Sequence, residues 1–242
     1  MPSLTAPTTS VKEIPLLFTK ENRSLVRQRL KWETRRGMKI PDWTADVKPW
    51  TGGAQAFNNT GRGMNFVSSP YGMPQNHWEG SVRYWMREPV QVLGFPDSPI
   101  CDIAAEVLYL DTNTRRVVEM TNDDHDKLMA RKDWRKPSTA LFMLKSFTRT
   151  WLKGVRVWTE QLGAISEESA VAEGIQRFSY HPRSSMLAID VIEYGLENHP
   201  SLRGVSPIDA YRLIWESING SGSWGPDKWV WCIQFELMEG ES

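Results

Sequence analysis

The sequence predicts an α+β fold, namely a small closed β-barrel with peripheral helices and a long aromatic-rich loop. Three observations lead to this prediction. Short strand patterns recur along the chain, short helix patterns are interspersed among them, and the alternating segment 229–237 supplies a closing strand. Such a mixture fits one barrel with added helices.

The N-terminal third combines a strand, a helix and a long loop. Residues 14–18 form a short apolar run that is compatible with a first strand. Thr19 can cap a helix over 19–29, because its hydroxyl can accept a hydrogen bond from a free amide of the first turn. Residues 41–80 show no sustained periodicity but are rich in aromatic residues, which favours an ordered flap over a loose linker.

Strand patterns recur in the rest of the chain, at residues 82–86, 103–110, 116–120, 146–162 and 229–237. Helix patterns lie between them, at residues 121–132, 166–174 and 207–219. Ser166 can cap the second of these helices and Gly174 can end it. Pro207 suits the first position of the third helix. Residues 186–194 fit either a helix or a strand.

Composition restricts the class of protein. The chain has 242 residues, 29 basic and 29 acidic, with 40% hydrophobic and 24% charged residues, which is typical of a soluble globular protein. It contains no run of 18 apolar residues, so no membrane span is expected. Two cysteines that are distant in sequence indicate a reducing compartment. We expect a flexible tail at 1–11 and a single domain at 12–242, with an insertion at about 41–80.

One stretch is strongly basic. From Arg23 to Lys39 there are seven basic residues and one acidic residue, Glu33, which leaves a net charge of +6 in a chain whose overall charge is zero. Such an excess is typical of a site for an anion, most often phosphate, although a solvated helix face is the simpler alternative. Thr34 follows Lys31 by three residues, which would place a hydroxyl nucleophile beside an amine able to activate it.

The same stretch resembles a known family. Lys31-x-x-Thr34-x-Arg36 is similar to the Gly-Arg-Lys-Thr-x-Thr-x-Arg signature of ASCH domains, which are relatives of the PUA fold. This chain departs from the signature where Arg29, Leu30 and Trp32 replace its glycine, arginine and first threonine. The resemblance is to prophage-encoded ASCH proteins and runs from about residue 12 to 238. Its supporting segments are 70–72, 85–88, 165–175, 215–220 and 229–231.

The resemblance implies three catalytic residues. Some ASCH proteins are amidohydrolases that remove the acetyl group from N4-acetylcytidine with a lysine, a threonine and a glutamate. The matching positions here are Lys31, Thr34 and Glu173. Lys31 would be the base or the charge stabiliser, Thr34 the nucleophile or a positioning hydroxyl, and Glu173 the proton shuttle. An ordinary ion pair between Lys31 and Glu173 is the structural alternative.

The nucleic-acid contacts are expected from Arg29, Arg35, Arg36, Arg87 and Trp32. Arg35 and Arg36 would contact phosphates, and the indole of Trp32 would fill the pocket or stack on a ligand. Arg87 belongs to the segment Trp85-x-Arg87-Glu88, which also resembles the family. Its arginine would meet a phosphate or form a buried structural pair with a glutamate.

No metal or cofactor is expected. The histidines lie at no metal-ligand spacing, and neither a P-loop nor a dinucleotide-binding fingerprint is present. The expected partner is a nucleic acid or a modified nucleoside, in the cytoplasm of a bacterial host cell and without a membrane. Three functions stay open: a nucleoside-binding protein that hydrolyses an acylated base, an RNA- or DNA-binding module without chemistry, and a phage accessory protein that acts through protein contacts.

Overall fold

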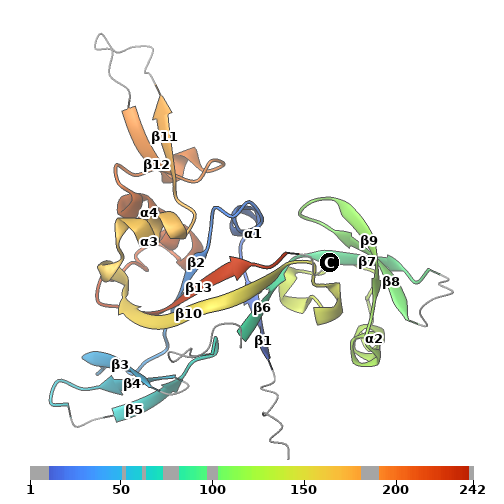
Figure 1. Cartoon of the computed structure of the whole chain (residues 1–242), viewed down its shortest axis with the longest axis horizontal. Helices are drawn as coiled ribbons and strands as arrows, with labels where there is room; N and C mark the ends of the chain where they lie inside the picture. The colour runs from blue at the N-terminus through green and yellow to red at the C-terminus, as the bar shows by residue number, and fades with distance from the viewer. Residues whose placement is uncertain are drawn as a thin grey trace, which may run out of the picture.

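The computed structural model describes residues 11–50, 53–61, 64–72, 82–96, 103–180 and 191–239. Over these residues it confirms the α+β class, with several β-sheets and four α-helices (Figure 1). The predicted tail lies outside the described residues except for Val11. Residues 73–80 of the predicted loop also lie outside them.

A five-stranded sheet forms the centre of the molecule, with its strands in the order β1-β6-β10-β13-β2. Strand by strand in that order, the bounds are Lys12–Leu17, Val82–Arg87, Trp151–Gln161, Trp229–Leu237 and Glu33–Gly37. The strands β1 and β6 run parallel, and the other neighbours run antiparallel. The ladders leave β1 and β2 as the two edges of this sheet.

The strand β13 has the predicted bounds, and apolar residues occupy both of its faces. Trp231, Ile233 and Phe235 are at most 2% exposed and pack with residues of β1, β6 and β10. Val230 and Cys232 are fully buried in a second cluster together with α3 and α4. The sequence predicted this strand from its alternation, and the structure shows that both of its faces are buried, the second one under the helices.

The stretch predicted as a long loop carries a three-stranded antiparallel sheet, so that part of the prediction was wrong. Its strands pair in chain order: β3 (Asp46–Trp50), β4 (Gly53–Phe57) and β5 (Met64–Ser68). Val47 and Ala54 join the core of the central sheet, so the flap is packed. The pattern was missed because the strands are short and contain proline and glycine, which normally argue against a strand.

Three helices pack around the β2 side of the central sheet (Figure 1). They are α1 (Lys20–Arg27), α3 (Glu167–Ala172) and α4 (Pro207–Asn219). The predicted capping hydroxyls of Thr19 and Ser166 each accept a hydrogen bond from the main-chain amide three residues on. The helix α1 ends two residues before its predicted end at residue 29, where the chain adopts a φ of 61° that a right-handed helix excludes.

A further three-stranded sheet forms a lobe beside the central sheet, on the right of Figure 1. It contains β7 (Val90–Gly94) and two strands that the sequence predicted, β8 (Ala104–Tyr109) and β9 (Thr114–Glu119). The predicted helix α2 (Asn122–Met129) and two 3-10 helices, Ala140–Phe142 and Lys145–Phe147, complete the lobe. Its residues form a third hydrophobic cluster.

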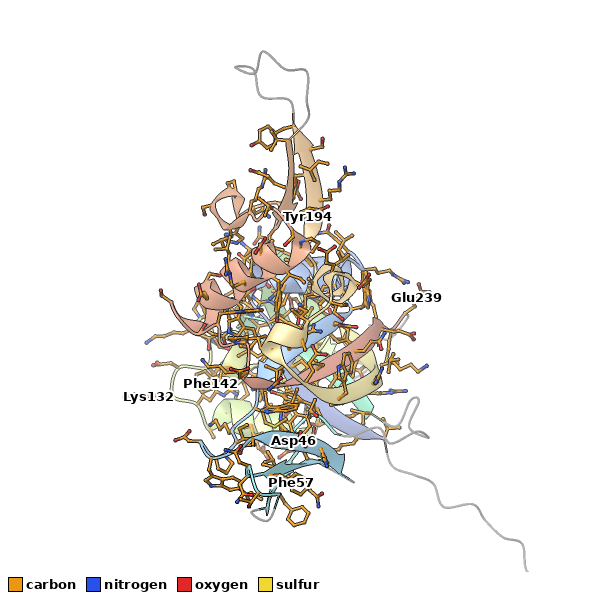
Figure 2. The ribbon with its side chains drawn as sticks, turned by 90° about the vertical axis from the view of Figure 1, so that its left-hand side faces the viewer. Asp46, Phe57, Lys132, Phe142, Tyr194 and Glu239 are labelled. Atoms are coloured by element: carbon orange, nitrogen blue, oxygen red, sulfur yellow. The ribbon has the colours of Figure 1, made fainter. Side chains whose placement is uncertain are left out.

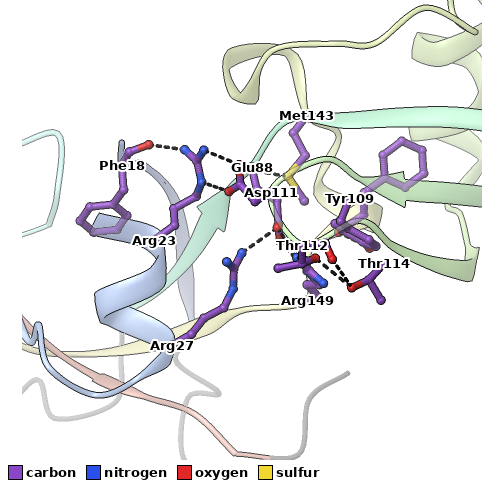
Figure 3. A network of polar contacts seen from close by, with 11 residues as sticks. Phe18, Arg23, Arg27, Glu88, Tyr109, Asp111, Thr112, Thr114, Met143 and Arg149 are labelled. Atoms are coloured by element: carbon purple, nitrogen blue, oxygen red, sulfur yellow. Dashed lines mark hydrogen bonds and ion pairs between the residues drawn. The ribbon is translucent and has the colours of Figure 1, made fainter. Parts of the chain in front are cut away.

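Buried charges join the lobe to α1 (Figure 3). The carboxylate of Glu88 is 0% exposed and accepts hydrogen bonds from Arg27 at 2.6 Å and from Arg149 at 2.6 and 2.9 Å. Arg23 of α1 forms an ion pair with Asp111, which lies in the turn between β8 and β9. The helix that borders the pocket described below is therefore held on its other side by the lobe.

A two-stranded hairpin projects from the molecule (Figure 1). It consists of β11 (Gln176–Tyr180) and β12 (Val191–Gly195), which resolves the ambiguity over 186–194 in favour of a strand from Val191 onwards. Residues 181–190 lie outside the described part. In Figure 2 this hairpin and the β3–β5 sheet lie at opposite ends, marked by Tyr194 and Phe57. Two further 3-10 helices span Leu162–Ala164 and Pro200–Leu202.

Candidate functional site

One pocket gathers most of the predicted site residues. It lies beside the open edge of β2, between the start of α1 and the end of α4. The pocket holds about 630 Å³ of space free of protein atoms, a volume that includes open solvent at its mouth. Lys31, Thr34 and Glu173 all line it, so the structure brings the three predicted catalytic residues together.

Glu173 reaches the pocket from the C-terminal end of α3. Directly after it, Gly174 turns the chain with a φ of 101°, and a Cβ there would lie 2.8 Å from a side-chain atom of α1, so the turn requires glycine. The main-chain amide of Trp32 donates to the carbonyl of Ala172 at 2.9 Å. This bond docks the segment before β2 against the helix end and places Lys31 beside Glu173.

Lys31 and Glu173 form a buried ion pair. The ammonium of Lys31 donates to Glu173 Oε2 in a short contact and to the Glu173 carbonyl at 2.8 Å. The two side chains are only 2% and 4% exposed. Burial lowers the pKa of Lys31, and the attraction of Glu173 opposes that change. The amine therefore releases its proton more readily than an exposed lysine, which suits a general base.

The second carboxylate oxygen of Glu173 accepts two further hydrogen bonds. The hydroxyl of Tyr211 donates at 3.1 Å, and Arg35 Nη1 donates at 3.4 Å. Burial and the nearby Glu173 raise the pKa of Tyr211, so its hydroxyl stays protonated and continues to donate. The sequence analysis predicted the helix at 207–219 that carries Tyr211 but assigned this residue no role in the site. The missed signal is that a buried phenol needs a hydrogen-bond partner.

Arg35 belongs to this buried cluster, which corrects the prediction that it contacts a phosphate. Its side chain is 0% exposed and lies among three carboxylates, with contacts of 3.5 Å to Glu33, 2.7 Å to Glu160 and 3.4 Å to Glu173. Burial also raises the pKa of Glu33. The alternation of a β-strand explains the difference, because Arg35 points to the opposite face from its two neighbours in β2.

Those neighbours, Thr34 and Arg36, line the pocket. Thr34 is 4% exposed, and its hydroxyl makes no hydrogen bond to any residue that the structure describes, Lys31 included. Arg36 donates to the carbonyl of Leu17 at 2.5 Å, and its guanidinium lies 5.2 Å from the centre of the Phe18 ring. The pocket thus offers a ligand one hydroxyl and one partly exposed cation.

Three predicted nucleic-acid contacts lie elsewhere. Arg29 forms an exposed ion pair with Glu239, and together with Trp32 it lines a separate shallow pocket over β13. Trp32 is 39% exposed there. Arg87 donates to the carbonyl of Leu141 at 2.8 Å and stacks on Trp85. None of these three lines the pocket that holds Thr34 and Glu173, although Lys31 lines both that pocket and the one over β13.

Internal ion pairs neutralise most of the basic stretch. Five of its cations have carboxylate partners inside the described part of the chain: Arg23, Arg27, Arg29, Lys31 and Arg35. The charge excess seen in the sequence is therefore not a continuous surface for an anion. Arg36 is the cation of this stretch that remains partly exposed at the pocket.

Within the described ranges, no three side chains of His, Cys, Asp or Glu gather closely enough to hold a metal ion. The described helices include none that is long and apolar enough to cross a membrane. Comparisons of the chain with protein-family models, with curated proteins and with solved structures give no match. The pocket and its chemistry are therefore the basis for a function.

Proposed function

We propose that the pocket binds a nucleobase, free or within a nucleic acid, and hydrolyses the amide bond of an N-acylated base such as N4-acetylcytidine. The observation that carries this proposal is the buried pair of Lys31 and Glu173 in the same pocket as the Thr34 hydroxyl, which has no hydrogen-bond partner in the described part of the chain. A nucleophilic hydroxyl and a proton-transfer pair are what acyl transfer through a covalent intermediate requires.

The reaction would proceed in two steps. The Thr34 oxygen forms a bond to the acyl carbon, and its proton passes to the pair of Lys31 and Glu173. The bond between the acyl carbon and the exocyclic nitrogen of the base breaks as the pair returns the proton to that nitrogen. Water then cleaves the ester on Thr34, which releases a carboxylic acid and restores the hydroxyl.

The surroundings of the pair support these roles. Glu173 is held by three donors, on Lys31, Arg35 and Tyr211, so its carboxylate is fixed in position. Fixed hydrogen bonds of this kind keep a catalytic group oriented without further cost in the transition state. Burial keeps water away from the amine of Lys31 and strengthens its interactions with nearby charge.

A second candidate is nucleobase binding without chemistry. It is favoured by the fact that the hydrogen bonds of the Lys31 ammonium both go to Glu173 rather than to Thr34. In that case the ion pair would support the pocket wall, and the Thr34 hydroxyl would bind the ligand. Both candidates use the same pocket and differ only in whether a bond is broken.

We also propose that the central sheet is the PUA-like barrel of an ASCH-type protein from a prophage, acting in the bacterial cytoplasm. The sequence motifs support this proposal, and so does one contact between the two edges of the sheet. Arg36 on β2 donates to the carbonyl of Leu17, the last residue of β1. A side chain thus bridges the two strands that would meet when such a barrel closes.

The experiment is an assay of purified protein with N4-acetylcytidine, free and within a single-stranded oligonucleotide. Released acetate and deacetylated base are measured by chromatography, and affinity is measured in parallel by calorimetry. We expect release of acetate that depends on protein concentration. Binding without release would leave the second candidate, and the absence of both would overturn the proposed function.

A further inference from the structure

The strand β2 presents its main-chain groups in a fixed alternation. At one end of its pairing with β13, the amide of Met38 donates to the carbonyl of Trp229 at 3.0 Å. At the other end, the amide of Phe235 donates to the carbonyl of Trp32 at 2.9 Å. In an antiparallel pair, every second residue bonds to the partner strand. The residues between these positions therefore direct alternate peptide groups away from β13.

Arg35 and Gly37 are residues of the second kind. Their amides and carbonyls point away from β13, and β2 is the last strand of its sheet. Within the described ranges, the amides and carbonyls of these two residues make no main-chain hydrogen bond. Both line the pocket. Because the side chain of Arg35 lies among buried carboxylates, its backbone is the part of this residue that remains for a ligand.

A second unpartnered group lines the same pocket. Trp215 of α4 is 7% exposed, and its buried indole Nε1 has no hydrogen-bond partner among the residues that the structure describes. Buried donors without a partner are rare in folded proteins, and a bound ligand is one of the ordinary ways to satisfy them. The wall formed by α4 and the wall formed by β2 therefore both carry unused polar groups.

We propose that these main-chain groups read the hydrogen-bonding edge of a nucleobase. The amide and carbonyl of Arg35, followed by the amide of Gly37, would pair with adjacent acceptors and donors on the edge of the base. This inference rests on the proposed function and deepens it, because it assigns base recognition to the backbone of β2. The catalytic residues would then act on the group attached to that edge.

The arrangement favours a base over the other ligands of a strand edge. A phosphodiester carries only acceptors and would be repelled by the carbonyls, whereas a base edge carries both donors and acceptors. A peptide that adds a strand to a sheet needs a long open edge. Among the residues that line this pocket, Arg35 and Gly37 offer outward main-chain groups of β2, and Lys31 and Glu173 occupy the same pocket.

The test uses two variants of Gly37. Proline removes the amide hydrogen of residue 37, whereas alanine retains it. The exchange is compatible with the strand, because the amide of Gly37 does not bond to β13 and proline is tolerated at such edge positions. Arg36 already has the extended conformation that a following proline demands. A Cβ at Gly37 meets no atom within 4 Å, and its φ is not in the left-handed region.

We expect Gly37→Pro to bind N4-acetylcytidine and cytidine about three- to tenfold more weakly than Gly37→Ala, the loss of one hydrogen bond. Both variants are compared by thermal unfolding to establish that each is folded. In labelled wild-type protein, addition of cytidine should shift the amide resonances of Arg35 and Gly37. This second measurement tests the inference even if the proline variant does not fold, because it uses the wild-type protein.

If the folded Gly37→Pro and Gly37→Ala variants bound the nucleosides with equal affinity, the inference would be overturned. It would also be overturned if the amide resonances of Arg35 and Gly37 did not shift in wild-type protein saturated with cytidine. Either result would leave the proposed function intact, because binding would still be observed. If the wild-type protein binds no nucleoside at any concentration tested, the proposed function fails and this inference fails with it.

Discussion

The hydroxyl of Tyr211 donates to Glu173 Oε1 at 3.1 Å, while Oε2 of the same carboxylate accepts from the ammonium of Lys31. One carboxylate thus connects helix α4 to the segment that leads into β2. Lys31, Glu173 and Tyr211 all line the pocket, so this connection is part of the pocket wall. The position of Lys31 therefore depends on a residue 180 positions away in the sequence.

Removal of the Tyr211 hydroxyl tests this relationship. Tyr211→Phe should lower the free energy of unfolding by about 1 kcal/mol, since one buried hydrogen bond is lost. It should also lower the deacylation rate, because Glu173 is less firmly held. Tyr180→Phe is the matched control, since it removes an exposed hydroxyl that donates to Glu193 on the projecting hairpin. Equal effects of the two changes on rate would contradict a role for Tyr211.

The buried lysine predicts a dependence of stability on pH. Because burial lowers the pKa of Lys31 below 10.5, the unfolded chain binds a proton on this amine at pH values where the folded chain does not. Stability therefore rises with pH between the folded pKa and 10.5. Lys31→Met should remove that rise, as measured by urea unfolding at several pH values up to about 10. Identical pH profiles of the variant and the wild type would contradict the lowered pKa.

The network between α1 and the lobe predicts a large loss of stability. Glu88→Gln leaves the cations of Arg27 and Arg149 near each other without their shared counterion. The expected cost is about 3–5 kcal/mol in the free energy of unfolding. Glu106→Gln is the control, because its pair with Arg115 is exposed and 3.8 Å long, so its cost should be under about 1 kcal/mol. If both changes lowered the free energy of unfolding by similar amounts, the network around Glu88 would not contribute more to stability than an exposed ion pair.

Arg36 and Arg29 should differ in nucleic-acid binding. Arg36→Ala should weaken binding to a single-stranded oligonucleotide and lower the slope of log affinity against log salt by about 0.7, the value for one phosphate contact. Arg29→Ala should leave the slope unchanged, because that residue lies outside the pocket. Titrations at several salt concentrations measure both slopes. If only Arg29→Ala changed the salt slope, the result would contradict binding at Arg36 and would place the nucleic-acid contact at Arg29.

The sequence was informative where local patterns determine structure. The strand at Trp229–Leu237, the cap at Ser166 and the turn at Gly174 follow from alternation, from a hydroxyl before a helix and from the freedom of glycine. The pairing of Lys31 with Glu173 was predicted because both residues match catalytic positions of the ASCH family that the sequence resembles. Their contact confirms that the two meet, and the choice between catalysis and simple pairing stays a prediction.

Long-range pairing is what the sequence did not reveal. Arg35 has one partner on its own strand, Glu33, but its other two partners, Glu160 in β10 and Glu173 after α3, come from distant segments, so its burial depends on the assembled fold. The exposed ion pair of Arg29 also depends on the assembled fold, because its partner Glu239 is near the other end of the chain. A run of cations in a sequence gives their number, and only the fold gives the carboxylates that neutralise them.

Turnover of N4-acetylcytidine by Thr34 variants decides whether the pocket is a deacylase. Thr34→Ala should abolish release of acetate while changing affinity by no more than a few fold, because a nucleophile contributes mainly in the transition state. Thr34→Ser retains the hydroxyl and should retain measurable turnover. If Thr34→Ala releases acetate at the wild-type rate, the hydroxyl is not the nucleophile and the account of this pocket as a deacylase is wrong.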